Sequence, residues 1–151
     1  MANTQAMCTS FKGELLTATH NFGTAPTRVA STADTFKAAL YLASATINAS
    51  TTAYSATGEV TGTNYTAGGA TVTNATAPAT SGTTAYWTPS ASITYSNVTL
   101  TTAFDTMLMY NSTQSNKAVA VYTFGSQTIT AGTFTLTMPT NDATTGLLRL
   151  A

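Results

Sequence analysis

The spacing of hydrophobic residues near the amino end predicts one short helix, over residues 11–21. Phe11, Leu15 and Phe22 recur with the three- to four-residue period of a helix face. Ser10 stands directly before this pattern, where a serine side chain commonly caps the first turn. A glycine and a proline follow the pattern and end it, so we expect the helix to be short.

The rest of the chain has the composition and periodicity of β-strands. It is rich in threonine, valine, tyrosine and phenylalanine, which fit a pleated sheet surface. Residues 34–43 and 133–139 alternate between apolar and polar positions, as strands with one buried face do. Residues 103–111 and 118–125 are apolar on both faces, which is typical of strands in the middle of a covered sheet. The inward positions predicted for the two alternating strands are Phe36, Ala38, Leu40, Leu42, Phe134, Leu136 and Met138.

Turn signals separate the predicted strands and indicate the fold class. The polar residues 111–117 form a hairpin-sized loop between the two apolar strands. Many short strands with turns between them favour antiparallel pairing. We therefore predict an all-β fold with one short N-terminal helix, arranged as an antiparallel β-sandwich or a jelly-roll-like barrel. Further strands are expected within residues 69–78, 83–88, 92–101 and 147–151.

The stretch GTNYTAGGATV, residues 62–72, admits two interpretations. A glycine-rich loop can cradle a phosphate, but such loops need a helix after them and usually a lysine at their end. Here Val72 and several threonines predict a strand after the glycines, and no lysine lies between Lys37 and Lys117. Paired glycines between strands are typical of a tight turn, because glycine adopts positive φ without steric cost. We predict a turn.

Length and charge narrow the class of protein. The 151 residues fit a single domain of residues 11–151, preceded by an N-terminal arm of residues 1–10 that lacks a core pattern. Only 7% of the residues are charged, against about 25% in ordinary soluble domains, and the net charge is zero. Such a surface must be wetted by hydroxyl groups or covered by partner subunits. About a quarter of the chain is threonine, which supplies the hydroxyl groups.

The same composition argues against several classes of function. The five basic residues are scattered singly, whereas nucleic-acid binding needs a clustered basic patch. No apolar run reaches the about 18 residues of a membrane-spanning helix, and the amino end lacks the pattern of a signal peptide. The single cysteine, Cys8, excludes an intrachain disulfide framework.

Candidate catalytic chemistry is sparse. His20 is the only histidine, so a catalytic triad or a histidine-containing metal site would have to use it. The role that we favour for His20 is instead a hydrogen bond at the end of the helix. Cys8 would need a basic neighbour such as Lys12 to become a nucleophile, and a plain thiol is expected. The five acids are widely separated, and Asp142 is expected in an Asx turn. We therefore predict no enzyme activity, no cofactor and no metal site.

Interaction candidates are the large apolar and aromatic residues. Aromatic residues and methionine are enriched at the centres of interfaces, although they serve equally well as core. The pattern T-x-T-x-T at residues 133–137 resembles a threonine face that binds ice, but ice binding needs regular ranks over several strands, so a solvated sheet face is predicted. The predicted interface residues are Phe11, Tyr65, Tyr86, Trp87, Met107 and Met109.

Taken in order, several segments resemble a family of small virion proteins of tailed bacteriophages. They are FKGELLTATHNF, DTFKAALYLA, GTNYTAGGATVT, LMYNSTQSNKAVAVYTFGSQTITAGTFTLTMPT and the terminal LLRLA, which together span nearly the whole chain from Phe11 to Ala151. The chain differs from that family in the region TYSNVTLTTAFDTM, which is richer in threonine and has Met107 where a small or polar residue is expected.

The resemblance implies a non-enzymatic β-rich building block of a virion, assembled in the cytoplasm of a host bacterium. A capsid decoration (cement) protein is the leading expectation, forming a homo-oligomer, with a trimer suspected, that contacts the major capsid protein. The N-terminal arm would then reach a neighbouring subunit. A head–tail connector or tail-associated structural protein is the alternative within this class. A host-surface or glycan-binding module with Tyr65, Tyr86 and Trp87 as a sugar-stacking set is the alternative from another class. Neither nucleic acid nor membrane is an expected partner.

Overall fold

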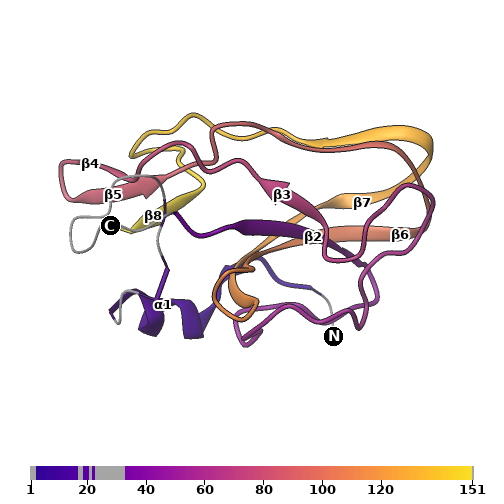
Figure 1. Cartoon of the computed structure of the whole chain (residues 1–151), viewed down its shortest axis with the longest axis horizontal. Coiled ribbons are helices and arrows are strands. Elements are labelled where there is room, and N and C mark those ends of the chain that lie inside the picture. Colours follow the sequence, from indigo (N-terminus) through magenta and orange to yellow (C-terminus); the bar gives the residue numbers. More distant parts are fainter. Residues whose placement is uncertain (1–2, 17–18, 21, 23–32, 151) are drawn as a thin grey trace.

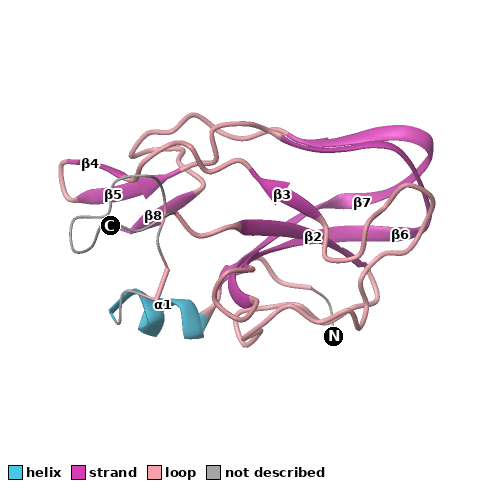
Figure 2. Ribbon diagram, viewed as in Figure 1, coloured by secondary structure: helices cyan, strands magenta, loops and turns pink. Residues whose placement is uncertain are grey.

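A computed structural model of the chain describes residues 3–16, 19–20, 22 and 33–150. It is an all-β structure with antiparallel sheets and one helix in the described part, which confirms the predicted fold class (Figures 1 and 2). The elements are β1 (Ala6–Met7), α1 (Thr9–Leu16), β2 (Phe36–Leu42), β3 (Ala70–Val72), β4 (Ala79–Ser81), β5 (Thr84–Trp87), β6 (Ile93–Asn111), β7 (Lys117–Leu136) and β8 (Leu148–Leu150).

Two sheets organise these strands. The larger has the order β1-β7-β6-β2-β3 and the smaller the order β4-β5-β8, with every pairing antiparallel. Both sheets are open, and their strand orders do not define a jelly roll. The small sheet lies at one end of the molecule, above α1 in the view of Figure 1.

The strands β6 and β7 form one long hairpin, where the sequence predicted four separate strands. Residues 112–116 make the turn between them, at the predicted loop. The hairpin folds back on itself, because the ring centroids of Phe124 and Phe134 lie only 5.2 Å apart. In a straight strand, two residues ten positions apart, as Phe124 and Phe134 are, would lie about 33 Å from each other. The bend coincides with register shifts on both sides of Phe104 in β6, as expected where a bulge lets a strand turn a corner.

The folded-back part of the hairpin forms a second layer over the central strands. It contains the first half of β6 and the last half of β7, and it runs along the top of Figure 1. Tyr95, in this part of β6, donates a hydrogen bond of 2.6 Å from its hydroxyl to the carbonyl of Ala38 in β2. Thr63 forms an isolated bridge with Thr99. The result is sandwich-like: the bent hairpin supplies strands to both layers.

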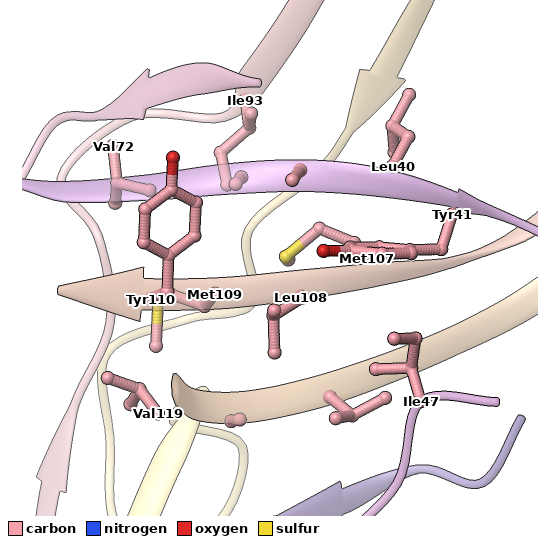
Figure 3. Packing of buried hydrophobic residues seen from close by; sticks show 14 of the residues in the cluster. Leu40, Tyr41, Ile47, Val72, Ile93, Met107, Leu108, Met109, Tyr110 and Val119 are labelled. Carbon is pink, nitrogen blue, oxygen red and sulfur yellow. The ribbon is translucent and has the colours of Figure 1, made fainter. Parts of the chain in front are cut away.

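The central strands β2, β6 and β7 carry the core (Figure 3). In β6, Met107, Leu108 and Met109 are all buried, which confirms the prediction of a strand covered on both faces. In β2 the predicted alternation is incomplete, because Ala39 and Tyr41 on the opposite face are also fully buried. The connection after β2 covers that strand as well, and its Ile47 is part of the core.

The amino-terminal residues belong to the domain. β1 pairs with β7, and the side chain of Asn3 donates a 2.8 Å hydrogen bond to Asp105 in β6. The predicted division into an arm of residues 1–10 and a separate domain differs from this arrangement, because residues 3–8 are held by the sheet itself. The helix begins at Thr9, two residues before the predicted start, so Ser10 lies inside its first turn rather than at its cap.

The glycine pair of residues 62–72 is a turn, as predicted. Gly68 and Gly69 have φ values of 88° and 74°, and the amide of Gly69 donates to the carbonyl of Thr66 at 3.0 Å. Strand β3 follows directly. A side chain at Gly69 would collide with the backbone of Ala38 in β2, so glycine is required here for space as well as for conformation.

Candidate interaction surface

Glu59 is the centre of a buried hydrogen-bond cluster in the connection between β2 and β3. Its carboxylate is 7% exposed and accepts hydrogen bonds from the hydroxyl of Tyr54 at 2.6 Å and from that of Tyr65 at 2.8 Å. The backbone amide of Gly68 donates a third, at 2.7 Å. The hydroxyl of Tyr65 also accepts from the amide of Leu40 at 3.0 Å. A buried carboxylate requires such donors, because burial without them is costly.

Further tyrosines surround this cluster and direct their hydroxyls to backbone carbonyls. Tyr41 donates to Ser55 at 2.5 Å, and Tyr110 donates to Gly68 at 2.8 Å. Burial raises the pKa of both Tyr41 and Tyr110 to about 12, with the negative charge of Glu59 acting in the same direction. Burial likewise raises the pKa of Tyr65. These hydroxyls are therefore neutral donors with a fixed structural use.

His20, Asp34 and Asn111 form a second buried polar cluster. Asn111 is fully buried, and its Nδ2 donates to Asp34 Oδ2 at 2.7 Å and lies 3.0 Å from His20 Nδ1. Gln114 also donates to Asp34, at 3.3 Å. The histidine ring packs edge-on against Phe11 with a centroid distance of 4.8 Å. His20 lies beyond α1, which ends at Leu16, and makes this polar contact to Asn111 of β6. The predicted hydrogen bond at the end of the helix stays a prediction.

Both clusters use their polar groups in hydrogen bonds within the chain. The Glu59 carboxylate accepts from three donors, and the Asn111 amide contacts both Asp34 and His20. Cys8 is fully buried, so it is not an exposed thiolate. In the parts of the chain that the structure describes, no three His, Cys, Asp or Glu side chains are grouped closely enough to hold a metal ion.

Asp142 forms the predicted Asx turn. Its Oδ1 accepts hydrogen bonds of 2.7 Å from the amides of Thr144 and Thr145. These bonds stabilise the charged form and lower the pKa of the carboxyl group. The turn leads into β8 and has a local structural role.

Most of the predicted interface residues lie in the core of their own chain. Phe11 and Trp87 are each 2% exposed, Met107 is 1% exposed and Met109 is fully buried. Their side chains have no free surface to offer a partner, because packing within the chain already uses it. Trp87 also donates from its indole nitrogen to the carbonyl of Thr76 at 2.8 Å. Tyr65 and Tyr86 are half-buried, and their contact with a partner stays a prediction.

An apolar pocket of about 180 Å³ lies between α1 and the small sheet. Its lining includes the aromatic residues Phe11, Phe22 and Trp87, and Leu148 and Leu150 of β8. Leu150 is the large hydrophobic residue that is most exposed in the described part of the chain, at 47%. The pocket therefore combines aromatic with aliphatic side chains.

The outer face of the folded-back hairpin is a neutral, hydroxyl-bearing surface. Thr133 and Thr135 of β7 are exposed, while Phe134 between them points inward, as the alternation predicted. On β6, Thr94 is exposed beside Thr135, with 3.4 Å between their hydroxyl oxygens. Residues 60–104 contain no charged residue and no histidine, and neither do residues 118–141. We call the exposed Thr94, Ser96, Thr133 and Thr135 the threonine face.

The sequence indicated the threonine face but neither of the buried clusters. The T-x-T-x-T alternation showed which side of β7 faces outward. In contrast, Tyr54 lies five positions before Glu59 and Tyr65 six positions after it, in a region without regular strands. No periodic signal marks such a cluster. Among the described residues, no helix combines the length and hydrophobicity that crossing a bilayer requires.

Comparisons with known proteins give no further assignment. A scan against models of protein families finds no match, and searches among curated proteins and among solved structures find none either.

Proposed function

We propose that this protein is a structural component of a bacteriophage virion, most specifically a capsid decoration protein that stabilises the shell through subunit contacts. The observation that supports this role is the threonine face, an uncharged sheet surface on a chain whose polar core groups are committed to internal hydrogen bonds. The resemblance of the ordered sequence segments to small virion proteins points in the same direction.

The threonine face suits assembly in symmetric arrays. Copies of one chain repel each other where like charges meet, and an uncharged face removes this repulsion. Association then depends on buried apolar area and hydrogen bonds, at about 25 cal/mol per Å² of apolar surface, rather than on ion pairs that salt weakens. The partners in this proposal are other copies of the chain, as a trimer, and the major capsid protein.

The proposal is tested by the location and abundance of the chain in the particle. We expect a particle reconstruction to show the chain on the outer surface of the shell, with a copy number that approaches that of the major capsid protein. A single small ring of copies at the neck would instead identify a head–tail connector and refute the decoration role. Complete absence of the chain from purified particles would refute the virion role.

A functional test uses particles that lack the chain. We expect such particles to release their DNA at a lower temperature, and added wild-type protein to restore the original temperature. The double variant Thr133→Lys/Thr135→Lys places two charges on the threonine face and should fail to restore it. Thr80→Lys is the matched control, because Thr80 is an exposed strand residue of the small sheet, away from that face.

The glycan-binding alternative has less support from the geometry. A sugar-stacking platform needs exposed ring faces, and Trp87 is only 2% exposed. The Tyr65 hydroxyl is committed to Glu59 and to the amide of Leu40. We therefore do not propose a glycan site at these residues.

A further inference from the structure

The second half of β7 has one open edge. On one side it pairs with β6 as far as Leu136. On the other side β1 pairs with it at Ala120 and Val121, and no strand among the described residues pairs with residues 124–136 there. In Figure 1 this part of β7 forms the upper border of the molecule. Backbone N–H and C=O groups of alternate residues therefore point away from β6, to a side where no described strand meets them.

This edge lacks most of the features that keep a strand edge from pairing with another chain. Proteins protect long edges with charged side chains or proline, or bend them away with a bulge. Residues 118–138 contain no charged residue, no histidine and no proline. One irregularity is present at Ala131, which has a positive φ of 46° where the register with β6 shifts. The regular part of the open edge is therefore residues 132–136.

The two faces of this regular part differ. Thr133 and Thr135 are exposed and belong to the threonine face, while Phe134 points to the opposite side and is half-buried. Phe134 lies edge-on to Phe104 at a centroid distance of 5.2 Å and is tilted against Tyr95 at 6.1 Å. A strand added at this edge continues both faces if it has the same alternation of hydroxyl-bearing and aromatic side chains.

We propose that a second copy of the chain supplies this strand, so that two β7 edges pair antiparallel about a two-fold axis at Phe134. Phe134 is the midpoint of the regular part, and each copy therefore contributes the same residues to the contact. In this register the two Phe134 side chains face each other, and Thr133 of each copy lies opposite Thr135 of the other. The two copies thus bring their threonine faces to one side and their aromatic faces to the other.

The composition of the edge favours an identical strand as its partner. Identical copies bring like charges together near a two-fold axis, and like charges directly opposite each other destabilise a strand pair. The uncharged edge avoids this penalty. Thr94 already lies beside Thr135, with 3.4 Å between the hydroxyl oxygens, and Thr133 of the second copy continues this row. Phe134, which its own chain covers only in part, gains apolar contact from its counterpart.

The contact is small, so we expect one pair of copies to associate weakly. Interfaces below about 1,200 Å² are typical of transient complexes. The pairing joins copies two by two, separately from the proposed trimer, and it does not depend on the virion role. In an array of many copies, such weak contacts reinforce one another because each copy is already held close to its neighbours.

The experiment measures the mass of the full chain in solution as a function of concentration, by sedimentation equilibrium. It compares the wild type with the double variants Thr133→Lys/Thr135→Lys and Thr133→Glu/Thr135→Glu. We expect the mass of the wild type to rise with concentration toward twice that of either variant, because like charges face each other across the axis in the variants. An equal mixture of the lysine and glutamate variants should recover the doubled mass, since opposite charges then meet.

The matched control is Thr80→Lys/Thr83→Lys, which adds two charges at exposed positions in β4 and in the turn after it, away from β7. It should associate as the wild type does. Circular dichroism checks that each variant keeps the wild-type fold, which we expect because all the substituted positions are exposed. The proposal would be overturned by equal masses of the wild type and the lysine variant up to about 1 mM, a level that tethered sites reach. A mixture that stays dissociated would overturn it as well.

A cross-linking measurement tests the register. The single variants Thr133→Cys and Thr135→Cys are oxidised separately and as an equal mixture; the native Cys8 is fully buried. Directly opposite residues have Cβ atoms about 4.5–5.5 Å apart and diagonal ones about 7–8 Å apart, and a disulfide needs about 3.5–4.5 Å. We expect the mixed disulfide to form severalfold faster than a disulfide between two copies of one variant. Equal rates would refute pairing about Phe134 and leave the decoration role, which is tested by location in the particle, unaffected.

Discussion

Replacing Tyr65 with phenylalanine tests how much the Glu59 cluster contributes to stability. The substitution keeps the ring, which stacks on Tyr95 with a centroid distance of 5.8 Å, and removes only the hydroxyl. That hydroxyl donates to Glu59 and accepts from the amide of Leu40, so two hydrogen bonds are lost. Tyr54→Phe is the matched comparison, because it removes one hydrogen bond to the same carboxylate and keeps the stacking on Tyr110.

The expected magnitudes follow from what each variant leaves unpaired. A hydrogen bond to a charged group contributes about 1.5–3 kcal/mol, and a buried donor without a partner costs about 1–3 kcal/mol. Tyr54 is half-exposed, so water replaces part of its bond, and we expect Tyr54→Phe to cost about 1 kcal/mol. Tyr65→Phe additionally leaves the amide of Leu40 unpaired in a buried strand, and we expect a loss of about 3–4 kcal/mol.

Urea unfolding at neutral pH, followed by circular dichroism, measures both free energies of unfolding under the same conditions. The informative quantity is the difference between the two variants, because ring burial and removal of a hydroxyl are common to both. Equal losses, or a larger loss for Tyr54→Phe, would refute the conclusion that Tyr65 joins Glu59 to β2. A changed denaturant slope would indicate an altered folded or unfolded state and would require a second probe.

Three further outcomes are expected. Gly69→Ala should lower the free energy of unfolding in urea by more than about 3 kcal/mol, because the added Cβ would collide with the backbone of β2. Gly82 has a φ of 59° and open space around it, so the control variant Gly82→Ala should cost only about 1 kcal/mol. Tyr41 and Tyr110 have pKa values raised to about 12, so the stability that they contribute is present below pH 10, the value for a free tyrosine, and is lost as the pH rises through 12. Ultraviolet absorbance of tyrosinate should therefore appear together with unfolding. The lowered pKa of Asp142 contributes stability at neutral pH that is lost as the pH falls through the lowered value, and Asp142→Ala should remove this part of the acid dependence.

Features of the fold that depend on neighbouring residues could be predicted from the sequence. The alternation around Phe134, the turn at Gly68 and Gly69, and the Asx turn at Asp142 each follow from residue types within a few positions. The two-sided apolar character of β6 likewise predicted its central place, because the period of a strand shows directly which faces are buried.

Features that depend on distant residues could not be predicted. The bend that brings Phe124 to Phe134 is set by packing on the central strands, and the two glycines of this stretch, Gly125 and Gly132, did not by themselves indicate it. The role of Asn111 depends on Asp34 and His20, which are remote in sequence and belong to no common period. Large apolar residues have the same sequence signature in a core and in an interface, and therefore Trp87 was open to either interpretation.

The pairing of β1 with β7 has a consequence for the order of folding. The β6–β7 hairpin closes through a turn of a few residues and can form as soon as β7 is synthesised. Ala6, in contrast, pairs with Val121, so the first strand of the chain must wait for nearly all of the others. Until then the edge of β7 is an unpaired strand edge, on which another chain can add. At high protein concentration, closure by β1 within one chain would therefore compete with exchange of the amino-terminal strand between copies.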